Sequence, residues 1–91
     1  MKHAGPKALD RIEPLLEQIR ALGFKEKSRG CFYIGGKGYL HFHEHGDDAL
    51  YADIGLGSAF DRWPAVTATQ HKAILARAAK DIAAGKPRRA R

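Results

Sequence analysis

Apolar residues recur at helical spacing near both ends of the chain. In the first segment they follow the three-and-four spacing of one buried helix face, at Ile12, Leu15, Leu16, Ile19 and Leu22. Asp10–Glu13 has the form of a capping box before them, and Gly23 is the residue type that closes helices. Pro14 lies in the first turn, where it predicts a kink or a separate helix start.

A second helix is predicted near the C-terminal end. Thr67–Gln70 forms another capping box, and Gly85 with Pro87 stops the helix. Arg77 can pair with Asp81 one turn later. The apolar face of this helix consists of Ile74, Leu75, Ala78, Ala79 and Ile82.

The middle of the chain has the composition typical of strands. Three runs rich in aromatic and aliphatic residues cover Cys31–Ile34, Tyr39–His45 and Ala49–Leu56. The connections at 35–38 and 46–48 contain the Gly or Asp residues of tight turns, so they predict consecutive hairpins. Phe60–Trp63 is a candidate fourth strand, which Pro64 would end.

A period of two decides which face of this sheet is buried. One face carries only apolar side chains, at Phe32, Ile34, Leu40, Phe42, Leu50, Ala52, Ile54 and Leu56. The predicted fold is therefore an α+β two-layer sandwich of order α-β-β-β-(β)-α, an antiparallel meander with both helices packed on one face. Because Phe42 lies on the covered face and Tyr39 on the other, truncating Phe42 should destabilise the protein far more.

The same alternation predicts an unusual set of side chains on the other face of the sheet, which we call the open face. An exposed antiparallel face normally carries Lys, Glu, Thr and Arg. Here the set is Cys31, Tyr33, Tyr39, His41, His43, His45, Tyr51 and Asp53. A three-residue loop at 46–48 pairs His41 with Asp53, whereas a slip by two residues sets His43 opposite Asp53. In either register a carboxylate lies beside an imidazole and should raise its pKa.

Three imidazoles on one side of a strand predict metal binding as one use of the open face. His41, His43 and His45 are spaced ~6.5–7 Å apart along the strand. Neighbouring pairs can share Zn²⁺, Ni²⁺ or Cu²⁺, with Asp53 or Cys31 as a further ligand. Since the spacing demands no closed set of four ligands, the alternative is a His-rich polar surface without a metal. A divalent transition metal is the one cofactor that the sequence leaves open.

The sequence leans against an enzyme. Cys31 can lie beside His41 or His43 on an adjacent strand, as nucleophilic catalysis requires. However, no helix N-terminus or nucleophile elbow follows Cys31 to supply an oxyanion hole. We therefore predict no catalytic residue.

Nucleic-acid binding is another candidate use of the open face. Aromatic residues on a sheet can stack on bases, and basic residues at the rim can contact phosphates. The aromatic residues here are Tyr33, Tyr39 and Tyr51, and the rim residues are Arg29, Lys37 and Arg62. Tyrosines equally suit a contact with a protein partner or a second copy of the chain.

Charge is unevenly distributed over the 91 residues, which have a net charge of +6. Residues 1–85 form the single predicted domain, whereas the basic tail 86–91 is expected to be disordered and to add weak attraction to nucleic acid. No apolar run approaches the ~20 residues that span a bilayer. The first residues also lack the apolar region of a signal peptide, so we expect a cytoplasmic protein without membrane contact.

Three segments of the chain resemble a group of small bacterial proteins of unassigned function. Tyr39–Glu44, Tyr51–Ile54 and Phe60–Thr67 are similar to the L-H-F-H-E strand, the A-D-[IV] strand and the start of the closing helix in that group. The resemblance runs from about Leu9 to Ile82. It implies a single α+β domain of bacterial, cytoplasmic origin and implies no activity.

The leading functional prediction is a binding module without catalytic activity. It would use the open face, centred on His41, His43 and Asp53, for a protein partner or for self-association as a homodimer. Metal binding through the His-x-His-x-His strand is the alternative. Weak nucleic-acid binding is the third.

Overall fold

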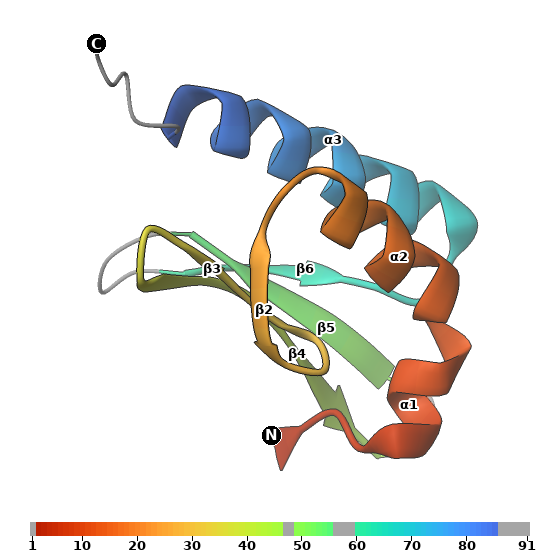
Figure 1. Ribbon diagram of the computed structural model, residues 1–91. Coiled ribbons are helices and arrows are strands. Elements are labelled where there is room, and N and C mark those ends of the chain that lie inside the picture. Colours follow the sequence, from red (N-terminus) through yellow and green to blue (C-terminus); the bar gives the residue numbers. More distant parts are fainter. Residues whose placement is uncertain (1, 47–48, 56–59, 86–91) are drawn as a thin grey trace, which may run out of the picture.

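A computed structural model describes residues 2–46, 49–55 and 60–85 of the chain. Its elements, in chain order, are β1 (Lys2–His3), α1 (Pro6–Arg11), α2 (Glu13–Ala21), β2 (Lys25–Ser28), β3 (Cys31–Ile34), β4 (Lys37–His45), β5 (Ala49–Ile54), β6 (Asp61–Pro64) and α3 (Ala68–Gly85) (Figure 1). The predicted tail 86–91 and the predicted core residue Leu56 lie outside the described residues.

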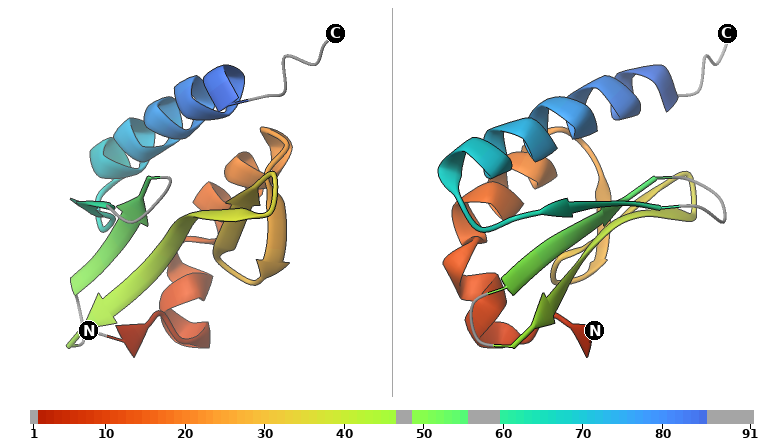
Figure 2. Two further views of the ribbon diagram at one scale, coloured as in Figure 1. Left: turned by 90° about the vertical axis from the view of Figure 1, so that its left-hand side faces the viewer. Right: turned by 180° about the vertical axis from the view of Figure 1, so that it is seen from behind.

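The sheet is an antiparallel meander in the order β2-β3-β4-β5-β6, and β1 pairs with β4 outside this path. α1 and α2 precede the meander and α3 follows it. The helices lie on one side of the twisted sheet, and no described helix covers the opposite side (Figures 1 and 2). The predicted α+β fold is confirmed. Within the described ranges, no helix is long and apolar enough to cross a membrane.

A single hydrophobic core joins the helices to the sheet. The predicted apolar face of the sheet is buried in it, since Phe32, Leu40 and Phe42 are at most 2% exposed. The helices contribute buried residues at the predicted spacing, and these are Ile12, Leu15, Leu16, Ile19, Ile74, Ala78 and Ile82.

The two predicted capping boxes have different outcomes. At the start of α3, Thr67 Oγ1 accepts a hydrogen bond from the Gln70 N–H at 3.1 Å, and Gln70 Oε1 accepts one from the Thr67 N–H at 3.0 Å. That box is confirmed. The box at 10–13 is wrong, because α2 has Ile12 at its N-cap without a side-chain cap. The chain divides into two helices there, and Pro14 is tolerated because the first turn of α2 needs no proline N–H.

Two strands carry no pattern that predicts them. β2 is polar and mostly exposed, and it pairs with β3 alone, so it lacks the apolar alternation of a half-buried strand. β1 has two residues. In contrast, β6 corresponds to the candidate fourth strand at 60–63, and its register pairs Asp53 with Arg62.

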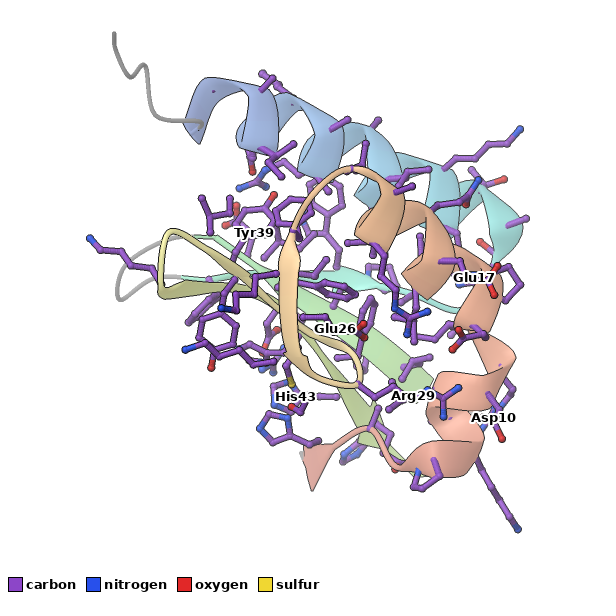
Figure 3. All side chains as sticks on the ribbon, viewed as in Figure 1. Asp10, Glu17, Glu26, Arg29, Tyr39 and His43 are labelled. Atoms are coloured by element: carbon purple, nitrogen blue, oxygen red, sulfur yellow. The ribbon has the colours of Figure 1, made fainter. Side chains whose placement is uncertain are left out.

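The prediction that Tyr39 lies on the open face is wrong. Phe32 pairs with Leu40 but Tyr33 pairs with Gly38, so Tyr39 is an extra residue on β4. Such a β-bulge interrupts the alternation of side chains. Tyr39 and Leu40 therefore both point into the core, where they are 1% and 0% exposed. Figure 3 shows Tyr39 on the α3 side of the sheet and His43 on the other side.

Tyr39 connects the sheet to α3 and to Phe24, the residue before β2. Its ring stacks on Phe24 with the centroids 5.1 Å apart, and its hydroxyl donates a hydrogen bond to Asp81 Oδ2 on α3 at 2.5 Å. The Arg77 Nε donates to the same oxygen at 2.6 Å, as the one-turn spacing predicts. Burial, followed by the hydrogen bond to Asp81, raises the pKa of Tyr39, so its hydroxyl stays protonated.

We expect Tyr39→Ala and Phe42→Ala to destabilise the protein by similar amounts, about 3–5 kcal/mol each, because both remove a buried ring. Tyr39→Phe should cost about 1–3 kcal/mol, since it removes only the hydrogen bond to Asp81. Denaturant unfolding measures all three, with Tyr51→Ala on the open face as the milder control. A Tyr39→Ala midpoint equal to that of the wild type would contradict the bulge.

Candidate metal-binding site

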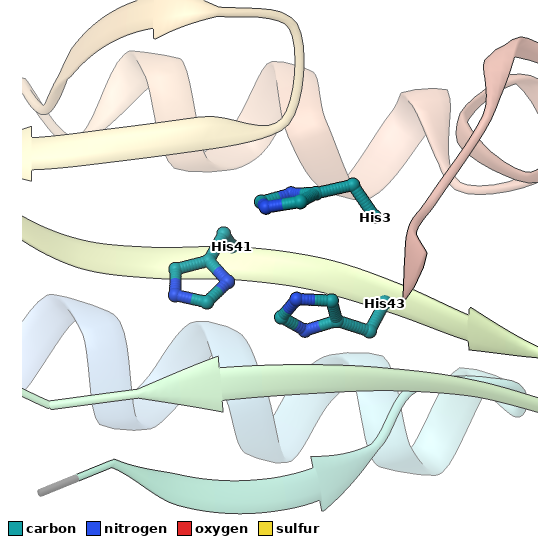
Figure 4. A group of neighbouring side chains, drawn as sticks. All are labelled: His3, His41 and His43. Carbon is teal, nitrogen blue, oxygen red and sulfur yellow. The ribbon is translucent and has the colours of Figure 1, made fainter. Parts of the chain in front are cut away.

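Three histidines from two strands meet on the open face. His41 and His43 alternate with the buried Leu40 and Phe42 along β4, and His3 on β1 is the register partner of His43. One ring nitrogen of each histidine lies within 4.8 Å of those of the other two. The three rings point toward one another (Figure 4). We call His3, His41 and His43 the histidine cluster.

The unequal lengths of β3 and β4 explain why His3 joins this cluster. β4 has nine residues whereas β3 has four, so the second half of β4 is free to pair with another segment. β1 occupies that edge, where the Ala4 N–H donates to the Phe42 carbonyl at 3.0 Å. The Gly5 N–H donates to Glu44 Oε2 at 2.7 Å, directly before α1 begins. The entry into α1 thus holds His3 against β4.

The rings of the histidine cluster are in close contact. The centroid of His43 lies 4.7 Å from that of His3 and 4.8 Å from that of His41. His3 is exposed, whereas His41 and His43 are half-buried. The ring of Phe60, 41% exposed, packs edge-on against His41 at 5.2 Å. The cluster therefore has a solvent-facing side at His3 and an aromatic wall at Phe60.

A buried carboxylate lies beside the histidine cluster. The register pairs His41 with Asp53, His43 with Tyr51 and His45 with Ala49, which confirms the alignment expected for a three-residue loop. Asp53 is 5% exposed, and Arg62 holds both of its oxygens at 2.8 and 3.0 Å. Asp53 Oδ2 also lies 3.0 Å from His43 Nδ1. One carboxylate thus contacts both a permanent cation and a member of the cluster.

Two imidazole nitrogens of the histidine cluster lack a hydrogen bond. His41 Nδ1 and His43 Nδ1 are buried without a hydrogen-bond partner among the described residues. The 3.0 Å contact of His43 Nδ1 with Asp53 is close, but it is not aligned as a hydrogen bond. Buried polar atoms are normally bonded to protein, water or an ion, so His41 Nδ1 marks the cluster as a place for a ligand.

The expected rise in histidine pKa is wrong. Burial lowers the pKa of both His41 and His43, and repulsion from neighbouring positive charge lowers it further. Asp53 does favour their protonated forms, but Arg62 neutralises it and opposes them. The hydrogen bonds from Arg62 also lower the pKa of Asp53 itself, despite its burial. Near neutral pH His41 and His43 are therefore neutral imidazoles next to the ionised carboxylate of Asp53.

The other predicted site residues have different positions. His45 is exposed near the end of β4, outside the histidine cluster. Cys31 is a half-buried free thiol and the register partner of His41. Tyr33 and Tyr51 are half-buried on the open face, and Lys27 lies over the Tyr33 ring at 4.6 Å. Of the predicted metal ligands, only His41 and His43 belong to the histidine cluster. Asp53 contacts His43 but is not a member of the cluster.

Three of the residues predicted to contact nucleic acid are not available for it. Tyr39 is in the core. Arg29 pairs with Asp10 and Glu13, both at 2.8 Å, and Arg62 pairs with Asp53. These ion pairs neutralise the rim charges that would contact phosphates.

Sequence reasoning missed His3 as a member of the site. A signal was present, since a strand predicted over 39–45 is longer than its predicted neighbour over 31–34 and needs another partner along its free edge. Pro6 also marks a helix start, which requires an extended segment before it. No pattern within residues 2–4 identifies that partner, because the pairing of β1 with β4 spans about half the chain.

No protein-family model, curated protein or solved structure matches this chain. The resemblance to the bacterial L-H-F-H-E group stays a prediction.

We expect His41 and His43 in the metal-free protein to titrate below the usual 6.5, and Asp53→Asn to lower both pKa values further by removing the carboxylate that favours the imidazolium. Since the unfolded chain then binds more protons than the folded one, the free energy of unfolding should fall as the pH drops below about 6.5. NMR titration of the ring resonances measures the pKa values.

Asp61→Asn is the control for that titration, because Asp61 pairs with Arg77 on α3 and not with the cluster. It should leave both histidine pKa values unchanged. Histidines that titrate at or above 6.5 in the wild type, or that do not respond to Asp53→Asn, would contradict the proposed balance of burial and charge.

Proposed function

We propose that this protein binds a divalent transition metal ion, with zinc as the leading candidate, through His3, His41 and His43. The observation that carries the proposal is the approach of the three ligand nitrogens to within 4.8 Å of one another on adjacent strands. Imidazole nitrogen is a common ligand of zinc, copper and nickel. Three histidines are also a known ligand set for zinc.

The protonation state of the cluster supports the proposal. A metal binds only the neutral imidazole, so every proton on a ligand competes with the ion. Burial lowers the pKa of His41 and His43 and keeps both rings neutral near pH 7. The site is thereby prepared for a cation without first releasing protons from these two residues.

The distances between the three ligand nitrogens are compatible with zinc once the rings move closer together. Zinc lies about 2.0–2.1 Å from each imidazole nitrogen, so tetrahedral ligands are about 3.4 Å apart. Rotation of the imidazoles must therefore bring the nitrogens closer than their present limit of 4.8 Å. His3 is exposed and lies on a strand of two residues, so it has the most freedom to move.

Asp53 supports the proposal as an outer partner of a ligand. A metal-bound histidine usually donates its second ring N–H to a carboxylate or carbonyl, which sets its tautomer and orientation. Asp53 Oδ2 lies 3.0 Å from His43 Nδ1, which leaves His43 Nε2 for the ion. Arg62 holds the carboxylate in place from the other side.

Titration of Zn²⁺ against a chromophoric chelator tests the proposal. His3→Ala, His41→Ala and His43→Ala should each weaken zinc binding by about tenfold or more, because each removes a ligand. Asp53→Asn should weaken it by about 10–100-fold, as changes to outer partners do. His45→Ala is the matched control, since His45 lies on the same strand outside the cluster, and it should bind zinc like the wild type.

Equal zinc affinity in the wild type and the three cluster variants would overturn the proposal. Loss of affinity in His45→Ala alone would also overturn it and move the site to the end of β4. Circular dichroism of each variant verifies that the fold is retained.

A second candidate function is self-association through the open face, and the exposure of Phe60 favours it. Phe60 is 41% exposed beside His41 and, with Val66, is one of the two large hydrophobic residues that are exposed among the described residues. An exposed aromatic side chain on a face that also carries half-buried tyrosines is typical of a protein contact. Binding to a different protein partner would use the same surface.

Light scattering over a range of protein concentrations tests self-association. The average mass should rise with concentration, and Phe60→Ser should abolish the rise because it removes the exposed ring. Val66→Ser is the control, since Val66 lies at the start of the α3 capping box and not on the open face. A mass of one chain at every concentration would contradict the prediction.

The cellular setting that we propose is the bacterial cytoplasm. Its reducing conditions would keep Cys31 as a free thiol. Weak nucleic-acid binding remains the third proposal. The half-buried Tyr33 and Tyr51 would stack on bases, whereas Arg29 and Arg62 are held in ion pairs and would not contact phosphates.

A further inference from the structure

We infer that Cys31 is the fourth ligand of the proposed metal ion, which makes the site a closed set of three imidazoles and one thiolate. The inference rests on the proposed function, because it assigns the remaining coordination position of the same ion.

The strand register brings Cys31 to the histidine cluster. Cys31 and His41 are direct partners across the antiparallel pair of β3 and β4. Phe32 is buried on the helix side, so its neighbour Cys31 points to the open face, as His41 does. Side chains of directly opposite residues start about 4.5–5.5 Å apart at their Cβ atoms.

A pocket at the start of β3 has both Cys31 and His3 in its walls. Its volume is about 380 Å³, and its walls include His3 and Cys31 together with Ser28 and Phe42. β1 and β3 both pair with β4, at His43 and at His41 respectively, so this pocket lies where the two strands approach along one edge. Cys31 is therefore the register partner of His41 and lines the same pocket as His3.

The Cys31 side chain must change its rotamer to bind the ion. The group of atoms within 4.8 Å of one another comprises the three histidine nitrogens, so the Cys31 sulfur must turn toward them. A cysteine side chain has a single χ1 rotation with three staggered positions. Cys31 is a free, half-buried thiol beside an open pocket, which leaves room for that rotation.

The chemistry of the set then defines the kind of site. On binding, the Cys31 S–H bond breaks, its proton passes to solvent, and a sulfur–metal bond forms without oxidation or reduction. Four protein ligands fill the tetrahedral shell of zinc and leave no position for a water molecule. Such closed sites are structural, whereas catalytic zinc sites keep one position open. The thiolate also favours zinc or Cu⁺ over harder cations.

Cobalt spectroscopy of the full chain tests the inference. Co²⁺ is titrated into reduced, metal-free protein, and we expect visible d–d bands of a tetrahedral ion together with a near-ultraviolet thiolate-to-cobalt charge-transfer band. Because the chain has one cysteine, that second band reports on Cys31 alone. Cys31→Ser should lose the charge-transfer band and bind Co²⁺ about tenfold or more weakly. His45→Ala is the control and should retain both bands.

The outcomes separate the inference from the proposed function. Visible bands without charge transfer, unchanged by Cys31→Ser, would overturn the role of Cys31 and leave the three-histidine site intact. Absence of any cobalt band and of binding would overturn the proposed function as well.

A second measurement tests the inference on the wild-type protein itself. Zn²⁺ should slow the reaction of the single cysteine with a thiol reagent by about tenfold or more in the wild type, since a metal-bound thiolate is a poorer nucleophile. His41→Ala, which lacks a ligand, should lose this protection. Equal rates with and without zinc in the wild type would overturn the inference.

Discussion

The alternation of side chains along β4 positions both the core and the candidate site. Leu40 and Phe42 are buried beneath the helices, so His41 and His43 are placed on the opposite face. The same strand pairs with β3 and β1 along one edge and with β5 along the other. It therefore supplies His41 and His43 and pairs with the strand that carries His3. On its other edge it pairs with β5, which carries Asp53. The core and the candidate site are opposite faces of one strand.

The second constraint is the negative charge of Asp53, which is buried within the sheet. A buried carboxylate is costly unless it is paired, and Arg62 on β6 pairs with it through two hydrogen bonds. Because Arg62 neutralises this charge, Asp53 cannot hold His43 as an imidazolium, and burial sets the direction of its pKa. An ion pair in the sheet thus keeps a neighbouring imidazole neutral. The proposed metal site depends on this effect.

The candidate site also connects the N-terminal segment to the sheet. His3 lies on a strand of two residues that is held to β4 by the backbone bond of Ala4 and by the contact of Gly5 with Glu44. A metal ion shared by His3, His41 and His43 would add a third link between this segment and β4. The binding energy of the ion would then stabilise the packing of α1 as well as the site.

Loop length left two registers open between β4 and β5, and the structure has the one that pairs His41 with Asp53. Local patterns in the sequence predicted the fold class, the hairpins of β3, β4 and β5, and the capping box of α3. These follow from side-chain periodicity and loop length, which act between residues near in the chain. Tertiary structure alone decided three features: the bulge that buries Tyr39, the pairing of β1 that brings in His3, and the neutralisation of Asp53 by Arg62. The first and second break or extend the periodic pattern, and the third reverses an expected pKa shift. Each depends on packing and electrostatics between strands, which no single segment encodes.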